Sequence, residues 1–193
     1  MQFLKILEYP DPKLRTKARP LNPDEIAGNI SLIKDLVYTM YRADGIGLAA
    51  TQTGIGKRIT VLDVGRKSDK NRPCFLNEAD ILTANKDLII AVNPEIIFKE
   101  GKTSYEEGCL SIPKFNADVE RALEIKVKAL DISGREFVVE AKDLLSIAFQ
   151  HEIDHLDGIL FIDKVSPLKR SLYNASLKKK KSAKHEKEPD CTS

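Results

Sequence analysis

The 193-residue sequence predicts an α+β fold, and two observations support this prediction. Segments with apolar residues at three- and four-residue spacing, typical of helices, occur beside short segments that alternate or are rich in β-branched residues, typical of strands. The two kinds of segment do not alternate regularly, so a doubly wound parallel sheet is not expected. With 42% hydrophobic residues, the chain can bury the core of one domain.

The first helix is expected to begin at Asn22, a capping residue followed by a proline and two acidic residues that suit a first turn. Asp44-Gly45 is expected to end it. The run 59–64 is rich in β-branched residues and predicts a strand, whereas residues 65–87 are polar and lysine-rich and are interpreted as a long surface loop. The apolar face of the helix comprises Ile26, Ile30, Ile33, Leu36, Val37 and Met40.

The second half of the chain predicts four further strands and two helices. Alternation of apolar and charged residues is clearest at 123–129, and Ser133-Gly134 is expected to form a hairpin turn after it. A helical pattern covers residues 143–155, with Gly158 placed to end the helix, and Ser166-Pro167 opens a last helix. The strands are expected at residues 88–92, 123–129, 137–139 and 159–162.

Charge is nearly balanced over the whole chain but not along it. The formal net charge is +2, whereas residues 167–193 hold eight basic and three acidic residues, a net of +5, which leaves −3 for residues 1–166. The sequence therefore predicts a folded domain over 1–166, and a C-terminal helix over 167–193 that runs into a basic, disordered tail at the lysines 178–181. Contact of this tail with the ribosome is one hypothesis, and a solvated end without a partner is the alternative.

The composition also bears on the setting in which the protein works. The near balance of charge argues against a DNA-binding protein, and no apolar stretch approaches the roughly 18–20 residues of a membrane span. The first residues, MQFLKILEYPDP, lack the basic-then-apolar order of a signal peptide. Three cysteines are too few and too scattered for a disulfide framework. We therefore expect a cytoplasmic protein.

The segment Gln150-His151-Glu152-Ile153-Asp154-His155 carries the clearest chemical pattern. On a helix, His151 and His155 lie one turn apart on the same face, so both imidazoles can bind one metal ion. Glu152 lies beside the pair, where it can act as a general base without binding the metal. A packed or exposed histidine is the ordinary alternative, but two of the three histidines of the chain fall in this one pattern.

A catalytic metal needs a third protein ligand and an open position. In the large HExxH peptidase families the third ligand follows the motif, but the downstream residues Asp157, Asp163 and His185 do not match that spacing. Upstream, Cys109 is a candidate in the segment Glu107-Gly108-Cys109-Leu110-Ser111. A buried, unreactive cysteine is the alternative, although the flanking glycine and polar residues are more typical of a tight turn than of a core.

The glycine-rich segment GIGLAATQ, residues 45–52, joins the first helix to the strand at 59–64. It lacks the lysine and the preceding strand of a phosphate-binding loop. Its last residue, Gln52, offers an amide NH₂ donor, which suits the stabilisation of an oxyanion. A glycine-rich turn without a chemical role is the alternative.

Taken together, the segments GIGLAATQ, EGCLS and QHEIDHLDG resemble the three motifs of the peptide deformylases, in the same order. The resemblance extends over roughly the first 170 residues. The sequence departs from the family pattern at Thr51, where many members have proline, and in the stretch 65–87, which is long for the family. The resemblance implies antiparallel strands packed around the helix that bears the two histidines, and removal of the N-formyl group from formyl-methionyl polypeptides.

The resemblance also implies a role for individual residues. Cys109, His151 and His155 would hold one divalent metal ion, Fe²⁺ in cells, with Zn²⁺, Ni²⁺ or Co²⁺ able to replace it. Glu152 would be the general acid/base. The oxyanion would be met by two donors, Gln52 and the backbone N–H of Leu110. The substrate groove would be lined by Gly45, Ile46 and Gly47.

A pocket for the methionine side chain is expected where the helix next to His151 is apolar. Leu144, Ile147 and Ala148 are the candidates, with core packing as the alternative for each. Arg121 is predicted to hold the peptide backbone or to form a surface ion pair. Asp154 is predicted to orient a ligand or to form a buried structural hydrogen bond.

Three other functions fit parts of the sequence. An HExxH peptidase that cleaves internal peptide bonds would not need Cys109 as a ligand, and a structural metal site would not need Glu152 as a base. A ribosome- or RNA-binding factor that acts chiefly through its lysine-rich end is a third hypothesis.

Overall fold

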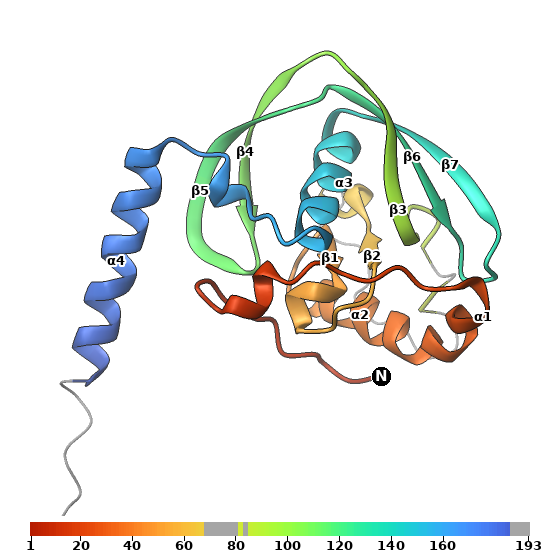
Figure 1. The fold of residues 1–193 in the computed structure, drawn as a ribbon, viewed down its shortest axis with the longest axis horizontal. Helices are drawn as coiled ribbons and strands as arrows, with labels where there is room; N and C mark the ends of the chain where they lie inside the picture. Colours follow the sequence, from red (N-terminus) through yellow and green to blue (C-terminus); the bar gives the residue numbers. More distant parts are fainter. Residues whose placement is uncertain (68–80, 83–84, 186–193) are drawn as a thin grey trace, which may run out of the picture.

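Among the residues that the computed structural model describes, 1–67, 81–82 and 85–185, seven strands form two antiparallel sheets (Figure 1). One sheet has the strand order β1-β2-β3-β6-β7, and the other pairs β4 with β5. The strands are β1 Gly47–Ala49, β2 Ile59–Leu62, β3 Ile89–Glu100, β4 Thr103–Cys109, β5 Ile112–Arg121, β6 Glu124–Leu130 and β7 Glu136–Lys142.

Helices follow or separate these strands and pack against them. Helix α3 contacts β1, β2, β6 and β7, whereas α2 contacts β1 and β2. The α-helices are α1 Pro23–Ile26, α2 Ile30–Arg42, α3 Asp143–Leu156 and α4 Pro167–His185. Short 3₁₀ turns are η1 Pro12–Arg15, η2 Ala27–Asn29, η3 Ala50–Thr53, η4 Val64–Lys67 and η5 Phe161–Asp163. The prediction of a mixed fold with antiparallel strands and a C-terminal helix is confirmed.

The first predicted helix is divided in two. α1 begins after Asn22, whose backbone N–H donates to the carboxylate of Glu25 at 2.8 Å, as the capping residues predict. The turn η2 then separates α1 from α2. This turn contains Gly28, a poor helix former, and the apolar face resumes in α2, where Leu36 and Met40 are fully buried.

Several strand predictions are confirmed, with changes in length. The strands expected at 59–64, 123–129 and 137–139 correspond to β2, β6 and β7, and 88–92 is only the beginning of β3. The sequence did not predict β1, β4 and β5. The β4–β5 pair carries many polar residues on its exposed side, so its hydrophobic pattern is weak. Strand β1 has only three residues and begins with a glycine, which is uncommon in strands.

The strand predicted at 159–162 is wrong. The chain forms the 3₁₀ turn η5 there, because the carboxylate of Asp163 accepts the backbone N–H of Leu160 at 2.9 Å and closes the turn. Leu160, Phe161 and Ile162 are all buried, which explains why an apolar run imitated a strand.

Helix α4 extends away from the rest of the molecule (Figure 1). Tyr173 anchors it: its ring lies 4.6 Å from that of Phe115, and its hydroxyl donates to the carbonyl of Pro113 at 3.3 Å. The helix continues through the lysines 178–181 to His185, further than expected, because lysine supports a helix. Residues 186–193, and with them the predicted tail, lie outside the described residues.

The segment 65–87, predicted as a surface loop, is described only at its ends and at residues 81–82. Ile81 is fully buried in the core beside α2, so the segment is not wholly at the surface. Asn85 donates to the hydroxyl of Tyr41 at 3.1 Å and to the buried carboxylate of Asp63. Within the part of the chain that the structure describes, no helix has both the length and the hydrophobicity needed to cross a membrane.

Candidate active site

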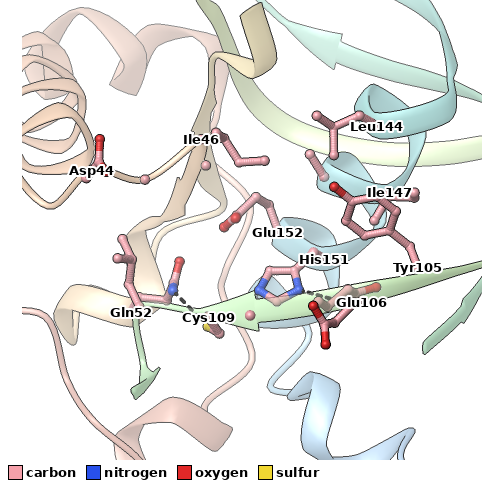
Figure 2. Close-up of a pocket in the computed structure, with 16 residues that line it drawn as sticks. Asp44, Ile46, Gln52, Tyr105, Glu106, Cys109, Leu144, Ile147, His151 and Glu152 are labelled. Atoms are coloured by element: carbon pink, nitrogen blue, oxygen red, sulfur yellow. Dashed lines mark hydrogen bonds and ion pairs between the residues drawn. The ribbon is translucent and has the colours of Figure 1, made fainter. Parts of the chain in front are cut away.

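A cavity of about 710 Å³ opens between the glycine-rich segment, strand β4 and helix α3 (Figure 2). The three sequence motifs, which are far apart in the chain, meet on its walls. Its lining residues are Asp44, Gly45, Ile46, Gly47, Gln52, Tyr105, Glu106, Glu107, Gly108, Cys109, Leu110, Leu144, Ile147, Ala148, His151 and Glu152.

Cys109, His151 and His155 converge at this cavity. The sulfur of Cys109 lies 3.1 Å from Nε2 of His155, which in turn lies 3.2 Å from Nε2 of His151, and all candidate ligand atoms lie within 4.8 Å of one another. Ligands of a tetrahedral ion at ordinary metal–nitrogen and metal–sulfur bond lengths lie about 3.3–3.6 Å apart. The three side chains therefore fit one metal ion.

Strand β4 brings Cys109 to the histidines through an irregularity in its pairing with β5. The register shifts between Glu107 and Cys109, where Gly108 intervenes, and such bulges change the direction in which a side chain points. Beyond the strand, the backbone N–H of Ser111 lies 3.4 Å from the sulfur of Cys109. This contact helps to hold the sulfur in place.

Contacts on the protein side hold both histidines. Nδ1 of His151 donates to the carboxylate of Glu107 at 2.7 Å, which leaves Nε2 free to bind a metal. The carbonyl of His155 accepts the hydroxyl of Thr51 at 2.9 Å, which ties this turn of α3 to η3. The Nδ1 atom of His155 is buried and has no hydrogen-bond partner among the described residues.

Glu107 is held in turn by Arg121. The guanidinium donates from Nε and Nη2 to the two oxygens of Glu107, at 2.6 and 2.9 Å. Burial by itself would raise the pKa of Glu107, but the hydrogen bonds from Arg121 and His151 outweigh it and lower that pKa to about 2. Glu107 is therefore an anion at neutral pH. The sequence reasoning assigned it no role, although it stands two residues before Cys109.

The structure corrects the prediction for Arg121. Its side chain is 2% exposed, does not line the cavity, and also donates to the carboxylate of Asp154 on α3. Arg121 thus lies outside the cavity lining, and its ion pairs are buried rather than at the surface: it joins β5 to the helix that bears the histidines. Asp154, which also pairs with Lys164 at 2.9 Å, takes the structural role that was one of its two predicted roles.

Glu152 lines the cavity and lies between Ile46 and His151 (Figure 2). It is 5% exposed, and its Oε2 atom has no hydrogen-bond partner among the described residues. Burial raises the pKa of Glu152 to about 7, although the neighbouring His151 opposes this shift. A carboxyl group with such a pKa can both take up and release a proton near neutral pH.

Gly47 is a glycine because Glu152 occupies the space where a side chain would lie. A Cβ atom at position 47 would lie 2.4 Å from Oε1 and 2.9 Å from Cδ of Glu152. The carboxylate is therefore positioned by direct contact with the backbone of β1.

We expect Gly47→Ala to lower kcat by about 100-fold, because the added methyl group displaces the carboxylate by roughly an ångström. Metal content should not change, since Gly47 touches none of the three candidate ligands. Steady-state kinetics and elemental analysis of the same preparation check this expectation. Gly28→Ala is the control, because a Cβ there meets nothing within 4 Å. Wild-type kcat in Gly47→Ala would show that the position of Glu152 is not set by this contact.

The amide of Gln52 is fixed at both ends. Its Oε1 atom accepts the backbone N–H of Ala49 at 2.8 Å, and its Nε2 atom donates to the hydroxyl of Ser111 at 3.3 Å and to the sulfur of Cys109 at 3.6 Å. The side chain is almost wholly buried, yet the residue lines the cavity. Its NH₂ group therefore lies beside the candidate metal ligands (Figure 2).

The structure brings most of the predicted substrate residues to the same cavity. Sequence reasoning missed five lining residues: Asp44, which directly precedes Gly45, and Tyr105, Glu106, Glu107 and Gly108, which directly precede Cys109; this adjacency was the available signal. Tyr105 lies beside Ile147 (Figure 2). Besides Gln52, Cys109, His151 and Glu152, the predicted residues that line the cavity are Gly45, Ile46, Gly47, Leu110, Leu144, Ile147 and Ala148.

Two histidines one turn apart, an adjacent buried glutamate and a nearby cysteine form a cluster that could hold a metal ion beside a candidate general base. Comparison with known proteins identifies the family. Residues 3–171 match the family model described as polypeptide deformylase, and the chain belongs to this family. It is an enzyme of that family.

Individual peptide deformylases are similar to this chain over nearly its whole length. A peptide deformylase of Thermodesulfovibrio yellowstonii is 45% identical over 182 residues, which are 94% of this chain and all of the relative. The crystal structure of a peptide deformylase from Legionella pneumophila has a TM-score of 0.78 and 40% identity, and the match covers 97% of this chain and all of that chain. A peptide deformylase of Ehrlichia chaffeensis in complex with actinonin has a TM-score of 0.78 and 31% identity, over 93% and 98% of the two chains.

Proposed function

We propose that the enzyme removes the N-formyl group from the N-terminal formyl-methionine of newly made polypeptides, releases formate, and uses Glu152 as general acid/base. Removal of this formyl group is the activity of the polypeptide deformylase family. The observation that carries the proposal is the meeting of Cys109, His151 and His155 beside the buried carboxylate of Glu152, at the inner end of a cavity.

The proposal includes one divalent metal ion, held by Cys109, His151 and His155. A thiolate and two imidazoles suit Zn²⁺ and Fe²⁺, and Ni²⁺ or Co²⁺ also bind such ligands; Fe²⁺ is our expectation for the cell. When bound, such an ion polarises a carbonyl group and makes a water molecule more acidic. The anionic Glu107 supports this site, because its hydrogen bond with Nδ1 orients the ring of His151 and leaves Nε2 as the ligand atom.

The protein then has one proton to move, in two steps. Glu152 accepts a proton from the water that attacks the formyl carbon, because its carboxylate is buried and has an oxygen without a partner among the described residues. It passes this proton to the departing amine, since an amide anion would be a poor leaving group. The wall formed by Gly47 keeps the carboxylate from turning away between the two steps.

The negative charge that develops on the formyl oxygen needs hydrogen-bond donors. The Nε2 atom of Gln52 supplies one, since the bond between Oε1 and Ala49 keeps the NH₂ end of the amide toward the cavity. The backbone N–H of Leu110, next to Cys109 on the cavity wall, is proposed as the second. Leu144, Ile147 and Ala148 form the apolar part of the cavity and are proposed to receive the methionine side chain, and Gly45, Ile46 and Gly47 the peptide backbone.

We expect Gln52→Ala to lower kcat about 10²–10³-fold, the usual loss when one oxyanion donor is removed. Gln52→Glu is the matched variant: it keeps an oxygen for the N–H of Ala49 but loses the NH₂ donor. Both variants should show the loss in a formate-release assay. If Gln52→Glu retained wild-type kcat, the donor role of the amide would be excluded.

Formate release from a formyl-methionyl tripeptide tests the function itself. The purified enzyme is loaded without oxygen with Fe²⁺ or with Zn²⁺, and formate is measured against an N-acetyl-methionyl peptide of the same sequence. Release from the formyl peptide supports the proposal. If neither form released formate, the deformylase assignment would be overturned.

The substrates of this reaction emerge from ribosomes, and we propose that the enzyme meets them in the cytoplasm. The net charge of +5 over residues 167–193 supports a contact with ribosomal RNA. Co-sedimentation with ribosomes should fall when the chain is ended after Leu177, and equal co-sedimentation of the two chains would exclude this contact.

A further inference from the structure

The first nine residues form an irregular segment that crosses three parts of the molecule (Figure 1). Its first half bonds to α2, because Gln2 donates its N–H to Asp35 at 2.7 Å and Leu4 donates its N–H to Thr39 at 2.9 Å. Its second half leaves α2 and bonds to η3 and to the turn between β4 and β5. We call residues 2–9 the N-terminal strap.

The second half of the strap bonds to the backbone of Gln52, the proposed oxyanion donor, and to the backbone of Ser111, whose side chain contacts that of Gln52. The N–H of Leu7 donates to the carbonyl of Gln52 at 2.7 Å, and the N–H of Tyr9 donates to the carbonyl of Ser111 at 2.8 Å. The side chains of Gln52 and Ser111 are bonded to each other, at 3.3 Å. The strap thus closes a ring that holds the amide of Gln52 beside Cys109.

This ring supplies a link that the rest of the fold lacks. In the described ranges, no backbone hydrogen bond joins η3 directly to the turn between β4 and β5. The contact between Gln52 and Ser111 is long for a hydrogen bond and is made by the two side chains alone. Leu7 and Tyr9 are two residues apart, so the strap fixes the spacing between two segments that come from distant parts of the chain.

The packing of the strap keeps these two bonds in place. Leu4 and Ile6 lie against the apolar core beside α2, whereas Leu7 and Tyr9 lie against a second core that includes Cys109. The strap therefore cannot shift along its length without withdrawing apolar side chains from two cores at once.

We propose that the N-terminal strap positions Gln52 for catalysis through the backbone N–H of Leu7. Leu7 is a positioning residue, because it acts on the substrate only through Gln52. The inference rests on the proposed function, in which Gln52 donates to the oxyanion. It predicts that this one backbone hydrogen bond affects kcat more than substrate binding or metal content.

The test compares Leu7→Pro, which removes the N–H, with Leu7→Ala, which keeps the N–H and removes the side chain. Both are made in the full-length, metal-loaded enzyme and assayed with a formyl-methionyl tripeptide. We expect Leu7→Pro to lower kcat about 10-fold with KM and metal content unchanged, and Leu7→Ala, which loses packing but keeps the N–H, to lower kcat several-fold less. Equal kcat in the two variants would overturn the proposal.

A double-mutant cycle separates positioning from general damage. If the strap acts through Gln52, Leu7→Pro has no further effect on kcat in a Gln52→Ala background. The same 10-fold loss in that background would overturn the proposal, since a merely structural defect would persist there. If Leu7→Pro does not fold, the N–H of Leu7 can be removed by replacing its amide bond with an ester, using the hydroxy-acid analogue of leucine. Wild-type kcat in this ester variant would likewise overturn the proposal.

The outcomes also distinguish this inference from the proposed function. If the wild-type enzyme released no formate, or if Gln52→Ala retained wild-type kcat, the proposed function would fail in its substrate or in its oxyanion donor. If both behaved as expected and Leu7→Pro matched Leu7→Ala, only the role of the strap would fail.

Discussion

Replacing Glu152 with glutamine is expected to lower kcat by about 10²–10⁴-fold, the contribution usual for a general acid/base. Glutamine has nearly the same size and shape as glutamate, so it fits beside Gly47 and should leave the fold intact. It cannot take a proton from water or return one to the leaving amine. Metal content and KM should stay near the wild-type values, because the three ligand candidates are untouched.

Steady-state kinetics on the formyl peptide and elemental analysis of the same sample check this expectation. Glu106→Gln is the matched control, because Glu106 lines the same cavity and the substitution removes the same carboxylate. Glu106 is exposed, so we expect kcat of this variant to stay within several-fold of the wild type. A Glu152→Gln enzyme with undiminished turnover would contradict the proposed mechanism. A purely structural metal site predicts that Glu152 has no role in turnover at all, so this experiment separates the two functions.

Replacing Cys109 with alanine is expected to weaken metal binding by about 100-fold or more, and activity should be lost with it. Even residues that only support a metal ligand contribute 10- to 100-fold to affinity, and a ligand contributes more. The two histidines would remain, but two imidazoles without a third protein ligand hold a catalytic ion poorly.

Competition with a coloured chelator measures this affinity, and circular dichroism verifies the fold. Cys109→Ser keeps the shape but exchanges a soft ligand for a hard one, and we expect a comparable loss of affinity. Cys191→Ala is the control for the loss of a thiol elsewhere in the chain. Retention of metal in Cys109→Ser would favour an ordinary HExxH peptidase over the deformylase assignment.

The sequence predicted the site residues that lie close together in the chain, but not those that only the fold brings together. His151, Glu152 and His155 lie on one helix, so their spacing alone predicts that they converge. Cys109 meets them only through the fold, and reasoning from the residues left it open between ligand and core residue. The resemblance of three ordered motifs, rather than the residues, pointed to its role.

The contact of Glu107 with Arg121 could not be predicted in this way. These residues lie 14 positions apart and meet because β4 and β5 pair as a hairpin whose strands gave little hydrophobic signal. Without that hairpin, Arg121 looked like a free cation available to a substrate. The strand expected at 159–162 failed for a related reason: burial produces an apolar run, but the hydrogen bond from Leu160 to Asp163 decides its conformation.

The contacts behind the three ligand candidates have a consequence for metal exchange. Glu107 orients His151, the hydroxyl of Thr51 holds the turn of His155, and the backbone of Ser111 lies against the sulfur of Cys109. Ligands that the protein has already ordered lose little entropy when an ion arrives, so the site is preorganised. A preorganised site with an open position does not change its shape to suit one metal ion, so it cannot select among metals in that way. Its affinities should follow the intrinsic order of the first-row metals, and the supply of each metal then decides which one the enzyme carries.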